Sequence, residues 1–172
     1  PSARRAEALV QNQVMAGWLQ GYGLGSYPPG EGSEPPRVEL PWNSLVIEGL
    51  LRYGYRTEAA ELFTRGMAAV VKSLRTERNF QQAYLAETGS GSGERAHLWG
   101  LAPLAAFLRV VGIELHSSTD LTIRGFNPFP WPVTVQYQRL QVTREGDQTR
   151  IDFSGRAPKV LSGTDAVRIT YT

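Results

Sequence analysis

Apolar residues recur at spacings of three and four through the first two thirds of the chain, and this period predicts helices. The predicted helices cover residues 3–20, 42–53, 57–74 and 97–111. The third keeps the spacing most regularly, and only Gly54-Tyr55 and Arg56 separate it from the second. So short a connection predicts that these two helices form an antiparallel αα-hairpin.

After Gly112 the pattern changes to alternation of apolar and polar residues, which predicts strands. The alternating segments lie near residues 121–123, 133–137, 140–144, 149–153 and 167–171. Gly146-Asp147 has the composition of a hairpin turn between two of them. Helices followed by strands predict two segregated layers or subdomains, and paired helices fit a toroid or a solenoid.

Two irregular stretches interrupt the helical part. Residues 26–41 are rich in proline, glycine and glutamate, and predict a long loop. Glycine and serine alternate over 89–93, directly before Glu94, and this pattern predicts a second loop. Such a loop could present the Glu94 carboxylate to a ligand, because glycine lets the backbone approach closely. The alternative interpretation is a flexible linker beside a solvated glutamate.

Composition excludes several classes of protein. The chain has 172 residues, a net charge of +2 and no cysteine, so it has neither a disulfide framework nor a thiolate metal site. No basic run favours nucleic acid, and no apolar run approaches the roughly 20 residues that span a bilayer. We therefore expect a cytoplasmic protein without nucleic-acid or membrane partners.

The sequence gives little support for a metal site or a cofactor site. The two histidines, His97 and His116, lack a second ligand at metal-binding spacing. The stretch Gly89–Glu94 is not followed by the Gly-Lys-Ser/Thr of a phosphate-binding loop. We expect neither a metal nor a cofactor.

Sugar chemistry remains open, because carbohydrate sites combine carboxylates with aromatic faces. Aromatic residues lie at predicted helix ends or in the connecting loops: Trp18, Tyr22, Tyr27, Trp42, Tyr84 and Trp99. The alternative for each is a place in the core or at its rim. Trp18 lies on the apolar face of its helix, which favours the core.

Two motifs resemble the C-terminal end of an (α/α)6-barrel glycosidase. The first is PWNSLVIEGLLRYGYRTEAAEL at Pro41–Leu62, and the second is GSGERAHLWGLAPL, which contains Glu94 and Trp99. Both are similar to glycoside hydrolase family 63, the group of processing α-glucosidases and mannosylglycerate hydrolase-like enzymes. Trehalases and amylo-α-1,6-glucosidases are more distant relatives.

The resemblance implies a fold and a reaction. The fold is mainly α: residues 1–112 are antiparallel α-hairpins of an incomplete (α/α)6 toroid, and residues 113–172 are a small antiparallel β subdomain. The reaction is inverting hydrolysis of an α-glucosidic or related bond in an oligosaccharide or small glycoside, with Glu94 as general base. Trp42 and Trp99 fall at cleft-lining positions of the family, and we place Tyr27 and His97 with them as substrate-binding candidates.

Two departures from the family pattern change this expectation. The general acid is usually an aspartate some two hundred residues before the base, and this chain has fewer than a hundred residues before Glu94. Arg95 also stands where the family often has an aromatic residue after Gly-Glu, and His97-Leu98-Trp99 stands where it often has Phe-Gly-Trp before the last helix. We therefore expect part of a longer enzyme, inactive by itself, whose apolar helix faces pair with the missing barrel portion or in a homo-oligomer. The alternatives are a non-catalytic carbohydrate- or protein-binding remnant and a plain helical scaffold with a β tail.

Overall fold

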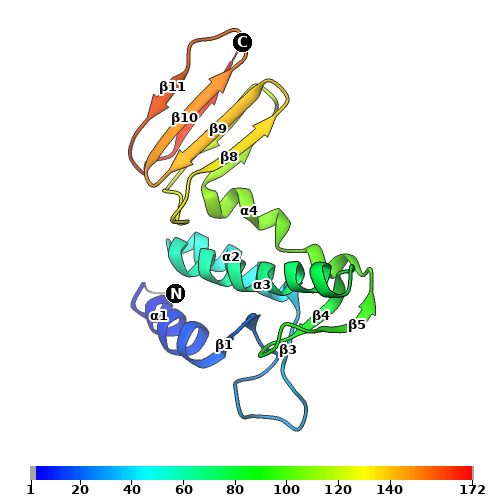
Figure 1. The fold of residues 1–172 in the computed structure, drawn as a ribbon. Coiled ribbons are helices and arrows are strands. Elements are labelled where there is room, and N and C mark those ends of the chain that lie inside the picture. Colours follow the sequence, from blue (N-terminus) through cyan, green and yellow to red (C-terminus); the bar gives the residue numbers. More distant parts are fainter. Residues whose placement is uncertain (1–2, 172) are drawn as a thin grey trace. The chain divides into compact units, whose positions relative to one another are not determined.

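The computed structural model describes residues 3–171, and its chain divides into two compact units, Pro1–Phe107 and Leu108–Thr172. Helices account for 36% of the structure and strands for 28%, and the sheets are antiparallel (Figure 1). The prediction of a mainly α fold is therefore wrong. Its error lies in the helical part, where segments predicted as helix or loop form short strands.

The first unit combines helices with small sheets. Its helical elements are α1 (Ala3–Ala8), η1 (Leu9–Trp18), α2 (Leu40–Arg52), α3 (Arg56–Thr76) and η2 (Leu98–Leu101). Its strands are β1 (Leu19–Gln20), β2 (Gly23–Leu24), β3 (Arg37–Val38), β4 (Gln81–Leu85) and β5 (Gly91–Arg95). The boundary between the units falls within α4 (Leu104–Val111).

The predicted αα-hairpin is confirmed, because α2 and α3 pack along each other. Pro41 stands in the first turn of α2, where its missing N–H costs least. Threonine often caps helices, but Thr57 does not cap α3: the N-cap is Tyr55, and no side chain there accepts a capping hydrogen bond. Buried side chains of α3 pack with β3 and β4 around Tyr84, which is fully buried.

The first predicted helix changes its winding after one and a half turns. Over Leu9–Trp18 it is a π-helix, and the N–H of Leu19 donates to the carbonyl of Val14, five residues earlier. A wider turn moves side chains off the 3.6-residue period. Leu9 is 58% exposed, although it belongs to the predicted apolar face.

The predicted loop at 89–93 is also different in the structure. Residues 91–95 form β5, which pairs antiparallel with β4, and β3 pairs with the other edge of β4. Residues 86–90 connect the two strands, with the turn at 86–88. The last predicted helix is likewise divided into the 3-10 helix η2 and α4.

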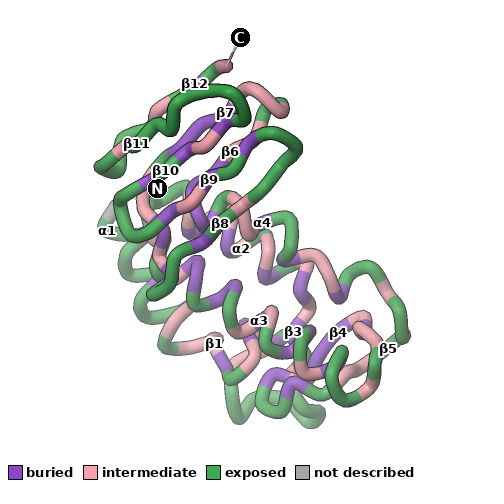
Figure 2. The backbone as a smooth tube through the Cα atoms, turned by 45° about the horizontal axis from the view of Figure 1, so that its top comes forward, coloured by how far each residue is buried: buried purple, intermediate pink, exposed green. Residues whose placement is uncertain are grey.

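The second unit contains two antiparallel sheets. One has the order β11-β10-β9-β8 and the other β12-β7-β6. Their strands are β6 (Ile113–Leu115), β7 (Asp120–Ile123), β8 (Val133–Tyr137), β9 (Leu140–Glu145), β10 (Gln148–Phe153), β11 (Lys159–Leu161) and β12 (Val167–Thr170). The predicted hairpin is confirmed, because β9 and β10 pair across Gly146-Asp147. Buried and exposed residues alternate along these two strands (Figure 2).

Within residues 3–171, every helix is too short or too polar to cross a bilayer.

Candidate functional site

A hollow of about 360 Å³ opens in the first unit between the end of η1 and the start of α2. Trp18 and Trp42 lie on its walls, and Trp42 is 63% exposed. Arg37 and Glu39 contribute charged groups to the same lining. We call this site the aromatic hollow. It lies within the size range of small-molecule pockets, and combines indole faces with a few polar groups.

The local sequence explains why the two charges share one face. The backbone is extended through Arg37-Val38-Glu39, up to the start of α2 at Leu40, so alternate side chains point to opposite sides. Val38 and Leu40 are fully buried. Arg37 and Glu39 therefore point away from the core and into the lining of the aromatic hollow.

Asn43 braces the wall of the aromatic hollow. Its Oδ1 accepts from the N–H of Leu24 at 2.8 Å, and its Nδ2 donates to the carbonyls of Leu24 and Glu39 at 3.2 and 3.1 Å. The Asn43 side chain is almost fully buried, and these three bonds join β2 to the first turn of α2. The hydrogen bonds of Asn43 therefore hold in place the backbone segments that carry Trp18 and Trp42.

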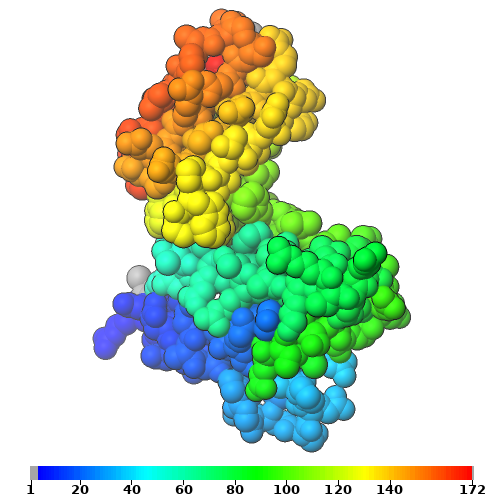
Figure 3. All heavy atoms as spheres, in the orientation of Figure 1, coloured from blue at the N-terminus to red at the C-terminus, as the bar shows by residue number. Residues whose placement is uncertain are grey.

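Tyr27 lies beside a second hollow, of about 290 Å³, within the loop that joins β2 to β3. Its hydroxyl donates to the carbonyl of Glu34, and its own carbonyl accepts from Nε2 of Gln20 at 3.2 Å. Ser26 and Arg37 line both hollows, so the two are neighbours. The loop atoms gather at one edge of this unit (Figure 3).

Glu94 lies on β5, at the edge of the three-stranded sheet, and is exposed. Its backbone N–H donates to Oε1 of Gln82 at 3.3 Å. Gly93 has φ +81°, a conformation that favours glycine, and a Cβ there would stand 2.5 Å from Gln82 Oε1, so the Gln82 side chain would have to shift. The Glu94 carboxylate is accessible to a ligand from the open side of the sheet.

His97 and Trp99 follow Glu94 at the start of η2. The His97 ring lies edge-on to the Trp99 indole, with 5.2 Å between their centroids. Nδ1 of His97 accepts from the N–H of Trp99 at 3.3 Å, which makes His97 the N-cap of η2. Trp99 is 46% exposed.

The sequence-predicted residues thus form two groups rather than one. Trp42 lines the aromatic hollow and Tyr27 its neighbour, whereas Glu94, His97 and Trp99 share a separate segment.

Glu94 lines neither hollow. Arg37 pairs with Leu85, while Glu94 lies near Gln82 on the far side of β4. Arg37 and Glu94 are therefore offset by three residues along the strand direction and by two strand spacings across the sheet. This offset corresponds to about 14 Å between their Cα atoms.

The sequence pattern misplaces some of the lining residues. Its period predicts Trp18 in the core, but Trp18 is half-buried and lines the aromatic hollow, because the π-helix rotates its position. Arg37 and Glu39 fall in a stretch predicted as loop. The alternation of Arg37 and Glu39 with two apolar residues is the signal that could have found them.

No group of three His, Asp or Glu side chains within residues 3–171 could hold a metal ion. His116, in the second unit, is hydrogen-bonded through Nε2 to Oγ1 of Thr122 at 2.9 Å.

Comparison with known proteins finds solved structures that are similar to this chain. The chain is similar to GH63 mannosylglycerate hydrolase from Thermus thermophilus, solved in complex with glucose and in complex with Tris. It is also similar to an uncharacterized conserved protein from the same organism. Each shares 30% sequence identity over 63% of this chain, with a TM-score of 0.51. No family model and no curated protein sequence matches the chain.

The matched part of the chain therefore has a GH63-like fold, that of a glycoside hydrolase. The chain spans about a quarter of the length of these relatives, 28% in two cases and 26% in the third.

Proposed function

We propose that this chain is the C-terminal part of a glycoside hydrolase that cleaves α-glucosidic or related bonds of small saccharides with inversion. The observation that carries the proposal is the 30% identity to mannosylglycerate hydrolase, one structure of which holds glucose. The order of the Pro41–Leu62 and Gly93–Trp99 motifs supports the same class. Kinship with trehalases and an (α/α)6 toroid are part of this proposal.

In the proposed reaction Glu94 is the general base. An inverting enzyme places two carboxyl groups roughly 6.5–9.5 Å apart, one to protonate the leaving oxygen and one to activate water. Exposure on the edge strand β5 gives the Glu94 carboxylate access to such a water. The general acid comes from outside this chain.

The aromatic hollow is the proposed place for a sugar ring. Indole faces of Trp18 and Trp42 offer apolar contact with the ring C–H groups, and Arg37 and Glu39 can donate to and accept from its hydroxyls. Trp99 and His97 are proposed to contact substrate near Glu94, and Tyr27 to shape the loop beside the hollow.

The missing barrel portion, or a second copy of the chain, is the proposed partner. Large apolar side chains are exposed on α2 and around η2: Trp42, Leu45, Leu98, Trp99 and Leu104. Exposed apolar groups in this number favour burial against another protein surface.

The test of catalysis restores the N-terminal barrel portion and compares wild type with Glu94→Gln on aryl α-glucosides and small α-glucans. Loss of a general base should lower kcat at least about a hundredfold. Glu87→Gln, at an exposed glutamate after β4, is the matched control and should leave kcat unchanged. Equal activity of wild type and Glu94→Gln would remove Glu94 from the mechanism.

A second function has a specific observation in its favour. Glu94 is not among the residues that line the aromatic hollow. A binding site without the proposed general base fits a non-catalytic remnant that binds carbohydrate or protein. Calorimetry of the 172-residue chain with glucose and maltose distinguishes the two. Heat of binding that Trp42→Ala abolishes, together with inactivity of the restored enzyme, favours the remnant. No heat and no activity favours a plain scaffold.

A further inference from the structure

A polar hollow of about 510 Å³ lies at one end of the four-stranded sheet in the second unit. Two neighbouring turns form its rim, one between β8 and β9 and one between β10 and β11. The N–H of Ser154 donates to the carbonyl of Arg139 at 3.0 Å, and Nη2 of Arg139 donates back to the carbonyl of Ser154 at 2.8 Å. The two turns are thus fixed to each other.

Three glutamine side chains line this site, which we call the glutamine hollow: Gln136, Gln138 and Gln141. Gln136 pairs with Gln141, and Gln141 pairs with Asp152, so these three residues stand in one row across β8, β9 and β10. Leu140 and Phe153 are buried on one face of the sheet, and this row lies on the opposite face.

The amides of these glutamines are uncommitted. All three residues are exposed or half-exposed, and within residues 3–171 their side chains make no hydrogen bond. Each amide supplies a carbonyl acceptor and two N–H donors. Asp152 adds acceptor oxygens, and the paired Arg150 guanidinium lowers the pKa of its carboxyl, which keeps it ionised.

The rim is rigid and holds one strained residue. Gln138 has φ +53° in the two-residue turn of the β8–β9 hairpin, where asparagine and glycine are preferred. A positive φ is strained for a non-glycine residue, and such outliers cluster at functional sites.

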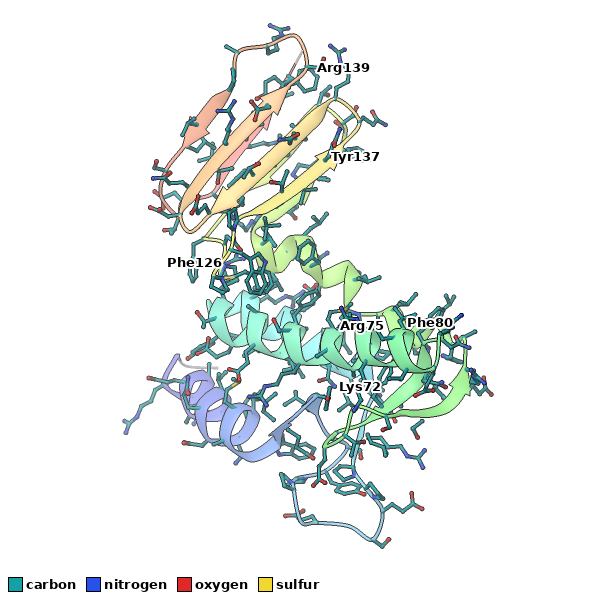
Figure 4. The ribbon with its side chains drawn as sticks, in the orientation of Figure 1. Lys72, Arg75, Phe80, Phe126, Tyr137 and Arg139 are labelled. Carbon is teal, nitrogen blue, oxygen red and sulfur yellow. The ribbon has the colours of Figure 1, made fainter. Side chains whose placement is uncertain are left out.

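The aromatic packing below the rim fixes Arg139. Its guanidinium lies over the Phe153 ring, 5.2 Å from the centroid, and Tyr171 stacks on Phe153 at 4.5 Å. Figure 4 shows Arg139 and Tyr137 at this end of the sheet. The bond to Ser154 uses one of the five N–H donors of the Arg139 guanidinium.

We propose that the glutamine hollow binds a neutral oligosaccharide. Neighbouring sugar hydroxyls need a donor and an acceptor side by side, and each amide offers both. The Asp152 carboxylate accepts from hydroxyls, and Arg139 donates to them. Both faces of the Phe153 ring are covered, so no aromatic platform adds to the affinity, and the expected Kd is about millimolar.

The residues of the glutamine hollow all belong to the second unit, whereas Glu94 belongs to the first, so the two proposals rest on different residues. The test of sugar binding at the glutamine hollow can therefore fail while the proposed hydrolysis holds. Equally, the test of hydrolysis can fail while the glutamine hollow binds sugar.

The experiment is a maltotriose titration of the 172-residue chain, followed by NMR of the glutamine side-chain NH₂ groups. Shifts at Gln136, Gln138 and Gln141 that saturate at millimolar maltotriose support the proposal. Gln141→Ala should weaken binding at least about tenfold. Gln148→Ala, at an exposed glutamine of β10 outside the hollow, should leave the Kd unchanged.

Three results would overturn the proposal. The first is the absence of shifts at the three glutamines, even where Glu94-dependent hydrolysis is intact. The second is an equal response of the Gln148 amide, which indicates nonspecific contact. The third is saturation of the same shifts by inorganic phosphate and not by maltotriose, which makes the hollow an anion site.

Discussion

At the scale of single residues, Arg144 is a charged side chain that is fully buried in the second unit. Its nitrogens donate to the carbonyls of Val111, Arg124 and Gly125 and to the hydroxyl of Thr149. A guanidinium suits this place because its fork of donors reaches several carbonyls at once. The last turn of α4 supplies one of these carbonyls, at the negative end of the helix dipole.

Arg144→Met should therefore destabilise the second unit by about 3 kcal/mol or more, because buried carbonyls lose their donor. Hydrogen exchange of the β9 and β10 amides measures the loss. Arg150→Met is the matched control: Arg150 is exposed and pairs with Asp152 at the surface, so its loss should change stability far less than the loss of Arg144. A similar effect of both substitutions would contradict this account of Arg144.

At the scale of elements, the packing of η2 on β4 holds the Glu94–Trp99 segment in place. Gly100 is buried, and a Cβ there would stand 2.3 Å from the carbonyl oxygen of Gln81 and 3.1 Å from the Tyr84 hydroxyl. The Tyr84 hydroxyl also accepts from the N–H of Gln81 at 3.2 Å, and burial raises the pKa of Tyr84. Any side chain at 100 pushes η2 away from the sheet.

Gly100→Ala should consequently lower the stability of the first unit by about 1–3 kcal/mol, as overpacking does. Gly49→Ala is the opposite control, because that glycine lies inside α2 with open space around its Cα. Alanine there should raise stability by about 0.5–1 kcal/mol. Urea unfolding followed by tryptophan fluorescence compares the two, and a stable Gly100→Ala protein would show that η2 is free to move.

At the scale of the whole molecule, α2 exposes large apolar side chains. Trp42 and Leu45 are 63% and 62% exposed on neighbouring turns of one helix. This chain covers only 28% and 26% of the two mannosylglycerate hydrolase structures that it resembles. Exposed apolar surface of this kind is typical of sites of protein–protein contact.

The chain alone should therefore self-associate at micromolar concentration, and Leu45→Glu should shift it towards the monomer. Sedimentation velocity over a concentration series measures the change. Val160→Glu, which replaces a 65% exposed valine of β11, should leave self-association as it is. A monomeric wild type over the whole series would contradict the prediction.

The sequence by itself determined the αα-hairpin of α2 and α3 and the hairpin of β9 and β10. Regular spacing and turn residues specify such neighbours locally, since the partners are adjacent in the chain. It also contains the two motifs that resemble a glycoside hydrolase, because each motif is a continuous segment whose residue types and order are visible without the fold.

Only the tertiary structure decided where the candidate residues lie. β3 and β4 are distant in sequence, and their pairing turned predicted loops into a sheet with Glu94 on its edge strand. The π-helix turned Trp18 towards the aromatic hollow, while Glu94 lies on the far side of β4. Local patterns cannot specify these placements, because non-local pairing and burial outweigh the propensity of each segment.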